Sequence, residues 1–515
     1  MENTGDSKAL FAGIGIGAVS VGVLSLLAKK FCCTSQEVEK ALEAPIEGDI
    51  KKILVCGSGM MTPSLIQYLM RKKNYVITIA SNILEDAKAI ADEYPGRAHS
   101  CYLDVSNEEA TKELVEQNDI VISFIPPFLH PKIFKACADA KRNLVTASYI
   151  SEEMMTYDEQ AKKDGLIFLN ECGLDPGIDI MSTMKIKDEV EAQGGKITKY
   201  ESWCGGLPCA EDSDNPLGYK FSWDPKAVFK TSRNQATFLK DGEVINIQPD
   251  DLLSEGTRVK DYVKALNLEG YPNRDSLAFK EAFGFKDAKT FVRGTIRYGG
   301  FRIIMRALHQ IGITEAVQEI DQSKIKTLRA LTESFAEGID AKVEDYTEQL
   351  NSASITDEED QKLISKLLQK IDNKDNIVDI INSWKFFELL NPDRNIEESW
   401  KTPLDALSAI SLEKMSYGEG ERDFVIMKHI FEIETAEGEK KTLHSTMLAT
   451  GDKVGSGGLT VMAKTVGFAA GAAVNLILEG KIKAKGVLSP KTPEFYNQIL
   501  PILEEDNITL VEEEV

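Results

Sequence analysis

The sequence has few of the residues that build metal sites and disulfide frameworks. It holds eight cysteines and five histidines among 515 residues. No two cysteines show the C-x-x-C spacing, and no two histidines the H-x-x-x-H spacing, of common zinc sites. The cysteines are also too sparse for the disulfide framework of a small secreted protein. We therefore expect no metal site and a reducing compartment.

Positive charge is also in deficit. The 60 lysines and arginines are outnumbered by 82 aspartates and glutamates, which gives a formal net charge of -22. Such a chain repels phosphate backbones, so nucleic-acid binding through bulk charge is excluded, although a local basic pocket for a small anion is not. Hydrophobic residues make up 43% and charged residues 28%. This composition is typical of a globular protein, and the length suggests two to four domains or one domain with large insertions.

One run without charge lies near the N-terminus. Residues 9–28 carry no charged side chain, which matches the roughly 20 residues needed to cross the hydrocarbon core of a bilayer. Lys29 and Lys30 follow the run and favour the cytosolic side for the large domain. We expect a membrane anchor with a single transmembrane helix at residues 1–33 and a polar linker at 34–50. A buried helix and a signal-peptide core are the competing interpretations.

From residue 51, short apolar runs alternate with segments of helical periodicity. Runs at 52–56, 75–80 and 119–125 are typical of strands buried on both faces, and a helical pattern follows each of them. The alternation continues to residue 172. It favours an α/β fold with a doubly wound parallel sheet of the Rossmann type, which we place at residues 51–172.

The first strand leads into a glycine turn that suits a phosphate group. Gly57 permits the tight turn, Gly59 lets the main chain approach a pyrophosphate, and the next helix supplies free N–H groups at its N-terminus. Thr62 stands where a third glycine is usual. The second strand ends in Ser81 and Asn82, where an acidic residue would favour NAD and an arginine NADP. Neither is present, so these residues leave the choice of cofactor open.

The alternation ends near residue 173. Strand pairs joined by Asp-Gly and Glu-Gly turns predict β-hairpins at 237–247 and 423–448. Between them, residues 314–399 are charged and typical of a solvated helical lobe. A predicted helix at 459–479 is rich in alanine and glycine, which favours close packing against another helix rather than a membrane role.

Several uncommon strings resemble the saccharopine dehydrogenases that form L-glutamate, also called saccharopine reductases, and the second half of animal aminoadipic semialdehyde synthase. The strings are VTASYIS around Tyr149, NECGLDPGIDIM from Asn170, SWCGGLPCAEDSDNPLGYKFSW from Ser202, EGYPNRDS from Glu269 and VRGTIRYGGF from Val292. The resemblance runs from about residue 51 into the late four-hundreds.

The resemblance implies a split architecture and an enzymatic activity. The Rossmann domain would be interrupted by a mixed α/β substrate domain at 173–313, a helical lobe at 314–404 and return strands at 405–450, with C-terminal helices at 451–515 returning to it. The family oxidises the secondary amine of saccharopine with NAD or NADP and hydrolyses the imine to L-glutamate and 2-aminoadipate 6-semialdehyde. The resemblance is compatible with a homodimer and with a mitochondrial location as the alternative to the cytoplasmic side of a membrane.

The resemblance also implies two sets of site residues. The cofactor residues would be Gly57, Ser58, Gly59, Met60, Met61, Ser81, Asn82, Ile83, Asp104, Val105, Ile125, Ser148, Tyr149, Leu174, Asp175, Pro176 and Asp224. The substrate residues would be Ser148, Tyr149, Asp175, Arg274, Thr295, Ile296 and Arg297. Fungal members have an arginine at the position of Asn82, so its absence slightly favours NAD.

The chemistry of saccharopine fits these residue types. It carries three carboxylates and two amino nitrogens, and Arg274 and Arg297 are natural carboxylate clamps because a guanidinium pairs with a carboxylate through two parallel hydrogen bonds. Asp175 could receive the substrate ammonium or transfer a proton, and Tyr149 could donate a hydrogen bond or proton near the imine. A turn-capping carboxylate and a buried structural tyrosine are the competing interpretations. A non-catalytic, membrane-tethered dinucleotide-binding scaffold and a related oxidoreductase with another substrate remain alternatives.

Overall fold

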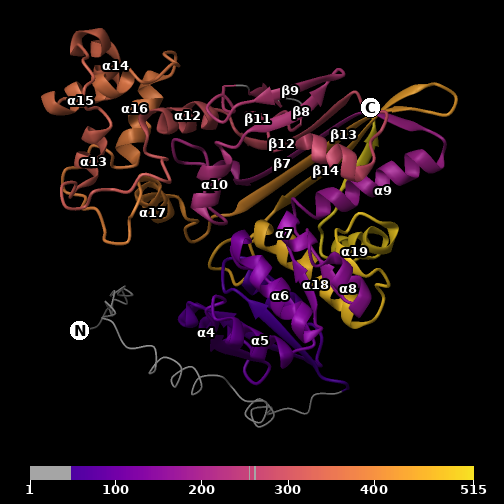
Figure 1. Cartoon of the computed structure of the whole chain (residues 1–515). Coiled ribbons are helices and arrows are strands. Elements are labelled where there is room, and N and C mark those ends of the chain that lie inside the picture. Colours follow the sequence, from indigo (N-terminus) through magenta and orange to yellow (C-terminus); the bar gives the residue numbers. More distant parts are fainter. Residues whose placement is uncertain (1–47, 255, 260–261) are drawn as a thin grey trace, which may run out of the picture.

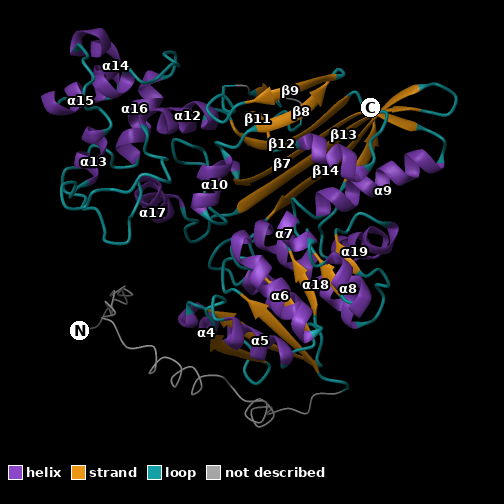
Figure 2. Cartoon of the chain, in the orientation of Figure 1, coloured by secondary structure: helices purple, strands orange, loops and turns teal. Residues whose placement is uncertain are grey.

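The computed structural model describes residues 48–254, 256–259 and 262–515 (Figure 1). The predicted membrane anchor at 1–33 and the predicted linker up to residue 47 lie outside the described residues. Figure 2 shows a parallel sheet at the bottom of the view, a larger twisted sheet above it, and a cluster of helices beside the larger sheet.

The first sheet has seven parallel strands in the order β15-β6-β5-β4-β1-β2-β3. Its strands are β1 (Lys51–Cys56), β2 (Tyr75–Ser81), β3 (Ala98–Tyr102), β4 (Ile120–Ser123), β5 (Asn143–Thr146), β6 (Ile167–Leu169) and β15 (Gly486–Leu488). Because β1 pairs with both β2 and β4, the direction of winding reverses beside β1. Ligands of doubly wound sheets bind at such a switch point, at the carboxyl ends of the strands. The predicted Rossmann-type sheet is confirmed.

Helices cover both faces of this sheet because successive strand residues point to opposite sides and both sets are apolar. Ile53 and Val55 pack against one group of helices, and Leu54 and Cys56 against the other. The first group is α3 (Thr62–Leu69), α4 (Leu84–Asp92), α18 (Val461–Leu478) and α19 (Pro493–Glu505). The second is α5 (Glu108–Glu116), α6 (His130–Ala140), α7 (Glu152–Met155) and α8 (Asp158–Asp164).

Helices α3 and α18 lie far apart in the sequence and pack directly against each other. A Cβ on Gly467 would lie 2.1 Å from Ser64 Oγ, and one on Gly471 would lie 2.3 Å from Tyr68 Cδ1. The close packing predicted from the small residues of this helix is therefore confirmed. By length and composition α18 is the one described helix that could span a membrane, but 72% of it is buried inside the protein. In Figure 1 the yellow α18 and α19 lie against the purple first part.

The second sheet has nine strands and is mixed, because β12 and β7 are parallel while the other pairs are antiparallel. Its strands are β7 (Lys196–Pro208), β8 (Ala236–Lys240), β9 (Glu243–Ile247), β10 (Thr257–Arg258), β11 (Leu268–Pro272), β12 (Thr290–Tyr298), β13 (Asp423–Glu434), β14 (Lys440–Thr450) and β16 (Val511–Glu514). Both predicted hairpins are confirmed, as β8–β9 and β13–β14.

The remaining helices either pack on the second sheet or form a cluster beside it. They are α9 (Ile178–Ala192), α10 (Pro225–Thr231), α11 (Ser276–Phe283), α12 (Phe301–Ile311), α13 (Leu328–Ser334), α14 (Thr347–Ser352), α15 (Glu358–Leu368), α16 (Ile377–Phe386) and α17 (Pro403–Met415), with short 3-10 turns η1 (Pro127–Leu129), η2 (Ala210–Asp212) and η3 (Val343–Tyr346). Helices α12 to α17 share a core around the fully buried Trp384. They form the cluster at the upper left of Figure 1.

The elements of the structure differ from the predicted domain ranges in two places. The boundary between residues 404 and 405 falls inside α17, which packs as one helix on the core of the lobe. The predicted return of all of 451–515 to the first domain fails for β16, which pairs with β14 in the second sheet. The reason is that the edge of β14 presents unpaired N–H and C=O groups that an added strand satisfies.

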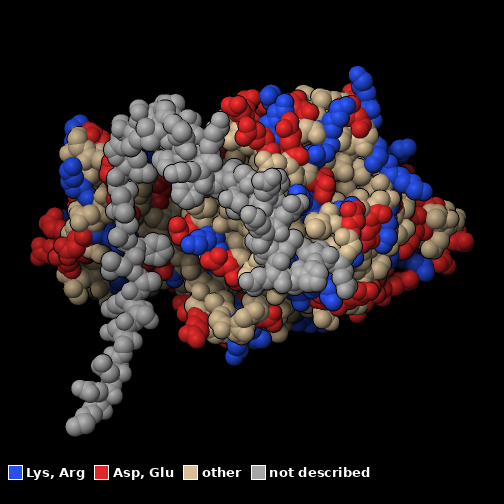
Figure 3. Space-filling model, turned by 90° about the horizontal axis from the view of Figure 1, so that it is seen from below, with Lys and Arg blue, Asp and Glu red and all other residues tan. Residues whose placement is uncertain are grey.

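Acidic and basic side chains are interspersed on the face of the molecule drawn in Figure 3. On that face the blue atoms do not merge into one broad patch.

Candidate active site between the two sheets

The turn after β1 has the geometry of a phosphate cradle. Gly57 has φ +109°, and a Cβ there would lie 2.3 Å from Phe124 O at the end of β4. Its N–H donates to Ala80 O of β2 at 2.8 Å, so the turn is fixed between the two neighbouring strands. A Cβ on Gly59 would meet nothing within 4 Å. Gly57 is thus required by the turn, whereas Gly59 faces open space in which a ligand can approach the main chain.

The N-terminus of α3 is open to an anion. Its N-cap residue Met61 makes no side-chain cap. Among the described residues, the N–H groups of Ser58, Gly59 and Met60 have no acceptor in the protein. Free N–H groups and the positive end of a helix dipole favour a pyrophosphate. The turn therefore fits a dinucleotide on its own geometry.

The other predicted cofactor residues follow the carboxyl ends of neighbouring strands. Ser81 ends β2, Asp104 and Val105 come after β3, Ile125 after β4, and Ser148 and Tyr149 after β5. Parallel strands end at one edge of the sheet, so these residues share that edge with the glycine turn.

The Ser81 side chain connects the glycine turn to the loop after β2. The Ser58 hydroxyl donates to Ser81 Oγ at 2.8 Å, and the Ile83 N–H donates to the same oxygen at 3.0 Å. The Asn82 side chain is exposed beside this pair. Tyr102 and Phe128, which sequence reasoning did not single out, are also exposed at this edge, Phe128 by 78%.

A pocket reaches from the glycine turn to the second sheet. Its lining residues come from the glycine turn, from the loops after β5 and β6, from the second sheet and its loops, and from α10 and α18: Met61, Ala147, Tyr149, Gly173, Leu174, Asp175, Pro176, Cys204, Gly206, Tyr219, Trp223, Thr231, Asn273, Arg274, Thr295, Arg297, Met462 and Val466. The two predicted arginine clamps therefore face the same pocket that the glycine turn reaches through Met61.

Two predicted site residues lie elsewhere. Asp224 is the N-cap of α10 and accepts from the Lys226 N–H at 3.0 Å, while its neighbour Trp223 lines the pocket. Ile296 is fully buried in the core of the second sheet, because strand alternation turns it away from Thr295 and Arg297. Ile296 could therefore meet a substrate only through its main chain.

Arg297 is a buried cation without an acidic partner. Its side chain, with the residue 6% exposed, lies between the rings of Tyr219 and Phe301, whose centroids are 4.9 and 5.1 Å from Cζ. Nη1 donates to the Ile296 carbonyl at 2.9 Å, and Nε has no acceptor. Among the described residues no carboxylate lies within 4.0 Å of it. A buried charge without compensation is costly, so this guanidinium is suited to an incoming anion.

Arg274 supplies a second unpaired guanidinium. Its Cζ lies 4.8 Å from the centroid of the Tyr149 ring, and within the described part of the chain it forms no ion pair. Its φ of +54° is unusual for a residue with a side chain. The Thr237 N–H holds this conformation by donating to the Arg274 carbonyl at 2.9 Å. The strained turn directs Arg274 into the pocket.

Tyr149 and Asp175 are joined at the wall of the pocket. The Tyr149 hydroxyl donates to Asp175 Oδ1 at 2.9 Å. Arg293 Nη2 donates to the same oxygen at 2.7 Å and to Asp179 Oδ2 at 2.7 Å. Sequence reasoning missed Arg293 and Asp179. Strand alternation was a usable signal for Arg293, since positions 293, 295 and 297 of β12 share one face.

A hydrogen bond to His130 holds the Ser148 side chain in place. Its two ring nitrogens lie 2.8 Å from Ser123 Oγ and 2.7 Å from Ser148 Oγ. Burial lowers the pKa of His130 to about 4, so the ring is neutral near pH 7. Sequence reasoning did not single out His130.

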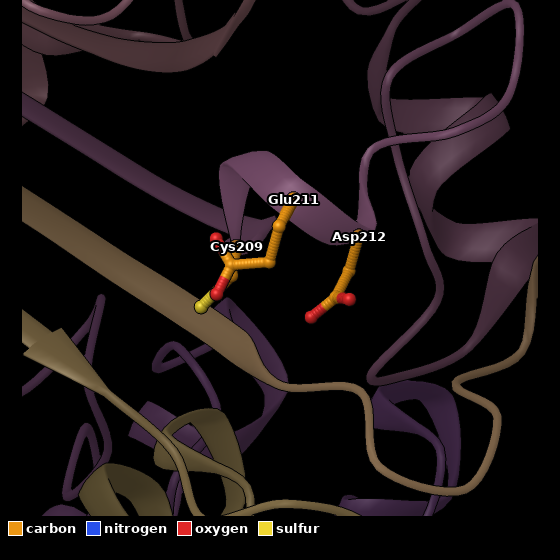
Figure 4. Close-up of side chains that lie close together, drawn as sticks. All are labelled: Cys209, Glu211 and Asp212. Carbon is orange, nitrogen blue, oxygen red and sulfur yellow. The ribbon is translucent and has the colours of Figure 1, made fainter.

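Cys209, Glu211 and Asp212 are close enough together to hold a cation, as Figure 4 shows. Their ligand atoms are already engaged. Arg422 donates to Glu211 at 2.7 Å through Nη2 and to Asp212 at 2.8 Å through its N–H. Burial raises the pKa of the Cys209 thiol to about 11, which disfavours the thiolate that binds metals. These contacts explain the cluster without a metal.

Two family models together match nearly all of the described chain. The model described as "Saccharopine dehydrogenase NADP binding domain" matches residues 53–169, and "Saccharopine dehydrogenase C-terminal domain" matches residues 173–508.

Curated relatives and a solved structure extend this similarity. The saccharopine dehydrogenase (NADP(+), L-glutamate-forming) of Pyricularia oryzae is 35% identical over 458 residues, covering 88% of this chain and 97% of that protein. The mitochondrial alpha-aminoadipic semialdehyde synthase of Mus musculus is 32% identical over 462 residues, covering 89% of this chain and 47% of that protein. The apo saccharopine dehydrogenase (L-Glu forming) of Saccharomyces cerevisiae has a TM-score of 0.78 at 33% identity, covering 90% of this chain and 100% of that chain. With this similarity along both sheets and the helical lobe, the chain belongs to the saccharopine dehydrogenase family.

Proposed function

We propose that this protein is an L-glutamate-forming saccharopine dehydrogenase. It oxidises the secondary amine of saccharopine with NAD(P)+ and hydrolyses the imine to L-glutamate and 2-aminoadipate 6-semialdehyde. One observation carries the proposal: Arg274 and Arg297, neither of them paired with a carboxylate of the described residues, line the same pocket as Tyr149 and Asp175. A tricarboxylate with a cationic nitrogen matches two free guanidinium groups that flank a carboxylate.

Each of these residues has a chemical role in the proposal. Arg274 and Arg297 bind carboxylates of saccharopine and hold its secondary nitrogen near Asp175. Tyr149 orients the Asp175 carboxylate by donating to Oδ1. Asp175 Oδ2 accepts from the substrate ammonium. Bound NAD(P)+ supplies the hydride acceptor, while the protein supplies position and electrostatics.

The proposed cofactor preference is NAD over NADP. Neither the turn 57–61 nor residues 81–87 contain a lysine or arginine that could bind a 2′-phosphate. Two acidic residues, Glu85 and Asp86, lie in the first turn of α4 behind Asn82. The P. oryzae relative carries NADP(+) in its name. The preference of this chain would therefore differ from that of a relative with the same fold.

The test is a steady-state assay of the purified full chain with saccharopine and either NAD or NADP. Formation of reduced cofactor, with L-glutamate identified as a product, is expected with both cofactors and is faster with NAD. Binding of dinucleotide without turnover at millimolar saccharopine would refute the enzyme and favour the scaffold. Turnover with another secondary amine alone would favour the oxidoreductase with a different substrate.

The location of the protein is a separate proposal that rests on sequence. We propose a membrane anchor within residues 1–33, with the catalytic part on the cytoplasmic side, and a mitochondrial location as the alternative. Fractionation should move the protein from membrane to supernatant when residues 1–30 are deleted, and a full-length chain found wholly in the supernatant would refute the anchor. Sedimentation of the same two proteins tests the proposed homodimer.

A further inference from the structure

Two carboxylates and one guanidinium are buried together behind the wall of the pocket. Arg293 Nη2 bridges Asp175 Oδ1 and Asp179 Oδ2, with 2.7 Å to each. The side chain of Asp175 is 18% exposed and lines the pocket, whereas those of Asp179 and Arg293 are 1% and 5% exposed and do not. The Phe279 ring, 4.0 Å from Arg293 Cζ, closes this layer on one side. Only Asp175 of the three can touch a substrate.

The hydrogen bonds leave one oxygen of Asp175 available. Oδ1 accepts from both Tyr149 and Arg293, and Oδ2 has no partner among the described residues. Both oxygens of Asp179 are engaged, because Oδ1 accepts from the Gly177 N–H at 2.7 Å and Oδ2 from Arg293. Asp179 is therefore held in place, and Asp175 has its second oxygen free to accept.

The charges of this group do not balance when both carboxylates are ionised. One guanidinium compensates one carboxylate, so the ionised group carries a net charge of minus one in a dry environment. Burial, followed by the nearby charge of Asp175, raises the pKa of Asp179 to about 7, while Arg293 opposes the rise. Two carboxylates this close titrate as a pair, so the group takes up one proton near neutral pH.

We propose that Asp179 and Arg293 are positioning residues that fit Asp175 to accept one proton from the secondary ammonium of the substrate. The inference rests on the proposed function and deepens it. In the step, an N–H bond of the ammonium breaks and its electron pair stays on nitrogen. The proton forms an O–H bond with Asp175 Oδ2, which leaves the group of three neutral. The resulting neutral amine carries the lone pair that an oxidation to the imine requires.

Tyrosine, cysteine and histidine side chains around this layer do not change charge near pH 7. Burial raises the pKa of Tyr149, of Tyr200 and Cys204 on β7, and lowers that of His429 on β13 to about 3. Arg274 and Arg297 remain cationic throughout. A further buried carboxylate, Glu171, lies in the loop before Asp175, and burial raises its pKa. An effect of substituting Asp179 on the pH profile can be assigned to the aspartate pair, because Glu171 is unchanged in that variant.

The first test is the pH profile of kcat/KM for saccharopine oxidation in Asp179→Asn. In the unmodified protein the rate falls on the acid side as the pair gains its proton. Asparagine at position 179 cannot take up the proton that the Asp179 carboxylate binds near pH 7, so the acid limb moves to lower pH by about one to two units. KM should change much less than kcat, because the substrate clamps are untouched. Glu189→Gln removes an exposed carboxylate from the same helix α9 and should leave the limb in place.

The second test needs no turnover. A folded-state pKa raised from the ordinary range to about 7 stabilises the protein below pH 4 and loses that stabilisation as pH rises through 7. The melting temperature of Asp179→Asn should therefore improve relative to the unmodified protein from pH 4 to pH 8. A difference in melting temperature that stays constant with pH would show that the two aspartates do not share a proton. This result can be read even if the unmodified protein fails to oxidise saccharopine and the proposed function is lost. Turnover with an unmoved acid limb would overturn the positioning role.

Discussion

The substitution Arg297→Met tests whether Arg297 binds the substrate or only stabilises the fold. Methionine keeps the apolar stem between Tyr219 and Phe301 but removes the charge. The loss of two cation–π contacts costs about 0.5–2 kcal/mol each. Removing a buried N–H group that has no acceptor returns about 1–3 kcal/mol. These terms oppose each other, and loss of the Nη1 hydrogen bond to the Ile296 carbonyl costs about 1 kcal/mol more, so the free energy of unfolding should fall by about 1–2 kcal/mol.

The effect on substrate binding is expected to be much larger. A carboxylate that loses a charge-assisted hydrogen-bonding partner loses about 3 kcal/mol, which corresponds to about 100-fold in affinity. Because the clamp binds a group remote from the reacting nitrogen, KM for saccharopine should rise by about this factor while kcat falls less. The KM for the dinucleotide should not change.

Arg302→Met is the matched control. Arg302 Nε forms an ion pair with the buried Glu269 carboxylate at 3.2 Å, outside the pocket. Its loss leaves an unpaired carboxylate, which costs about 3 kcal/mol of stability, and should leave KM unchanged. Urea unfolding and steady-state kinetics are measured on both variants. If Arg297→Met loses stability while its KM stays within about twofold of the unmodified value, Arg297 is structural and the clamp is refuted.

Three further substitutions test the cofactor site and the fold. Asn82→Arg places a cation at the end of β2 and should raise the ratio of kcat/KM for NADP over NAD by about tenfold or more, and an unchanged ratio would contradict the proposed 2′-phosphate position. Gly57→Ala puts a Cβ 2.3 Å from Phe124 O at a φ of +109° and should weaken dinucleotide binding at least about tenfold by calorimetric titration, with an unchanged affinity ruling out the cradle. Gly467→Ala puts a Cβ 2.1 Å from Ser64 Oγ and should lower the free energy of unfolding in urea by about 1–3 kcal/mol, so a neutral outcome would show that α3 and α18 can separate freely.

Local sequence patterns predicted the first sheet where its strands are buried on both faces. The apolar runs of β1, β2 and β4 are visible because both sides of each strand face helices. β3 (Ala98–Tyr102) escaped notice because it lies at the edge, with His99 and Ser100 only partly buried. β16 escaped because its residues are exposed and mostly acidic, and its pairing with β14 depends on a contact between distant segments.

The site was accessible from sequence to the extent that short motifs carry it. The glycine turn and the two clamps stand out from residue type and family resemblance. Asp179 and His130 do not, since a buried aspartate and a packed histidine look alike until their partners are known. Arg293 lies more than a hundred positions from both aspartates that it bridges. No local pattern encodes that distance, so the layer behind the pocket required a three-dimensional structure.

The interruption of the first sheet by the second has a consequence for synthesis of the chain. β15 (Gly486–Leu488) adds the last strand next to β6, and α18 covers the same face as α3. A nascent chain that has reached residue 172 therefore exposes an apolar face on which α18 has yet to dock. The ribosome must deliver almost the whole polypeptide before the nucleotide-binding half can close. A truncation before residue 461 would remove α18 and β15 and so prevent the nucleotide-binding domain from folding. Every residue of the glycine turn would still be present.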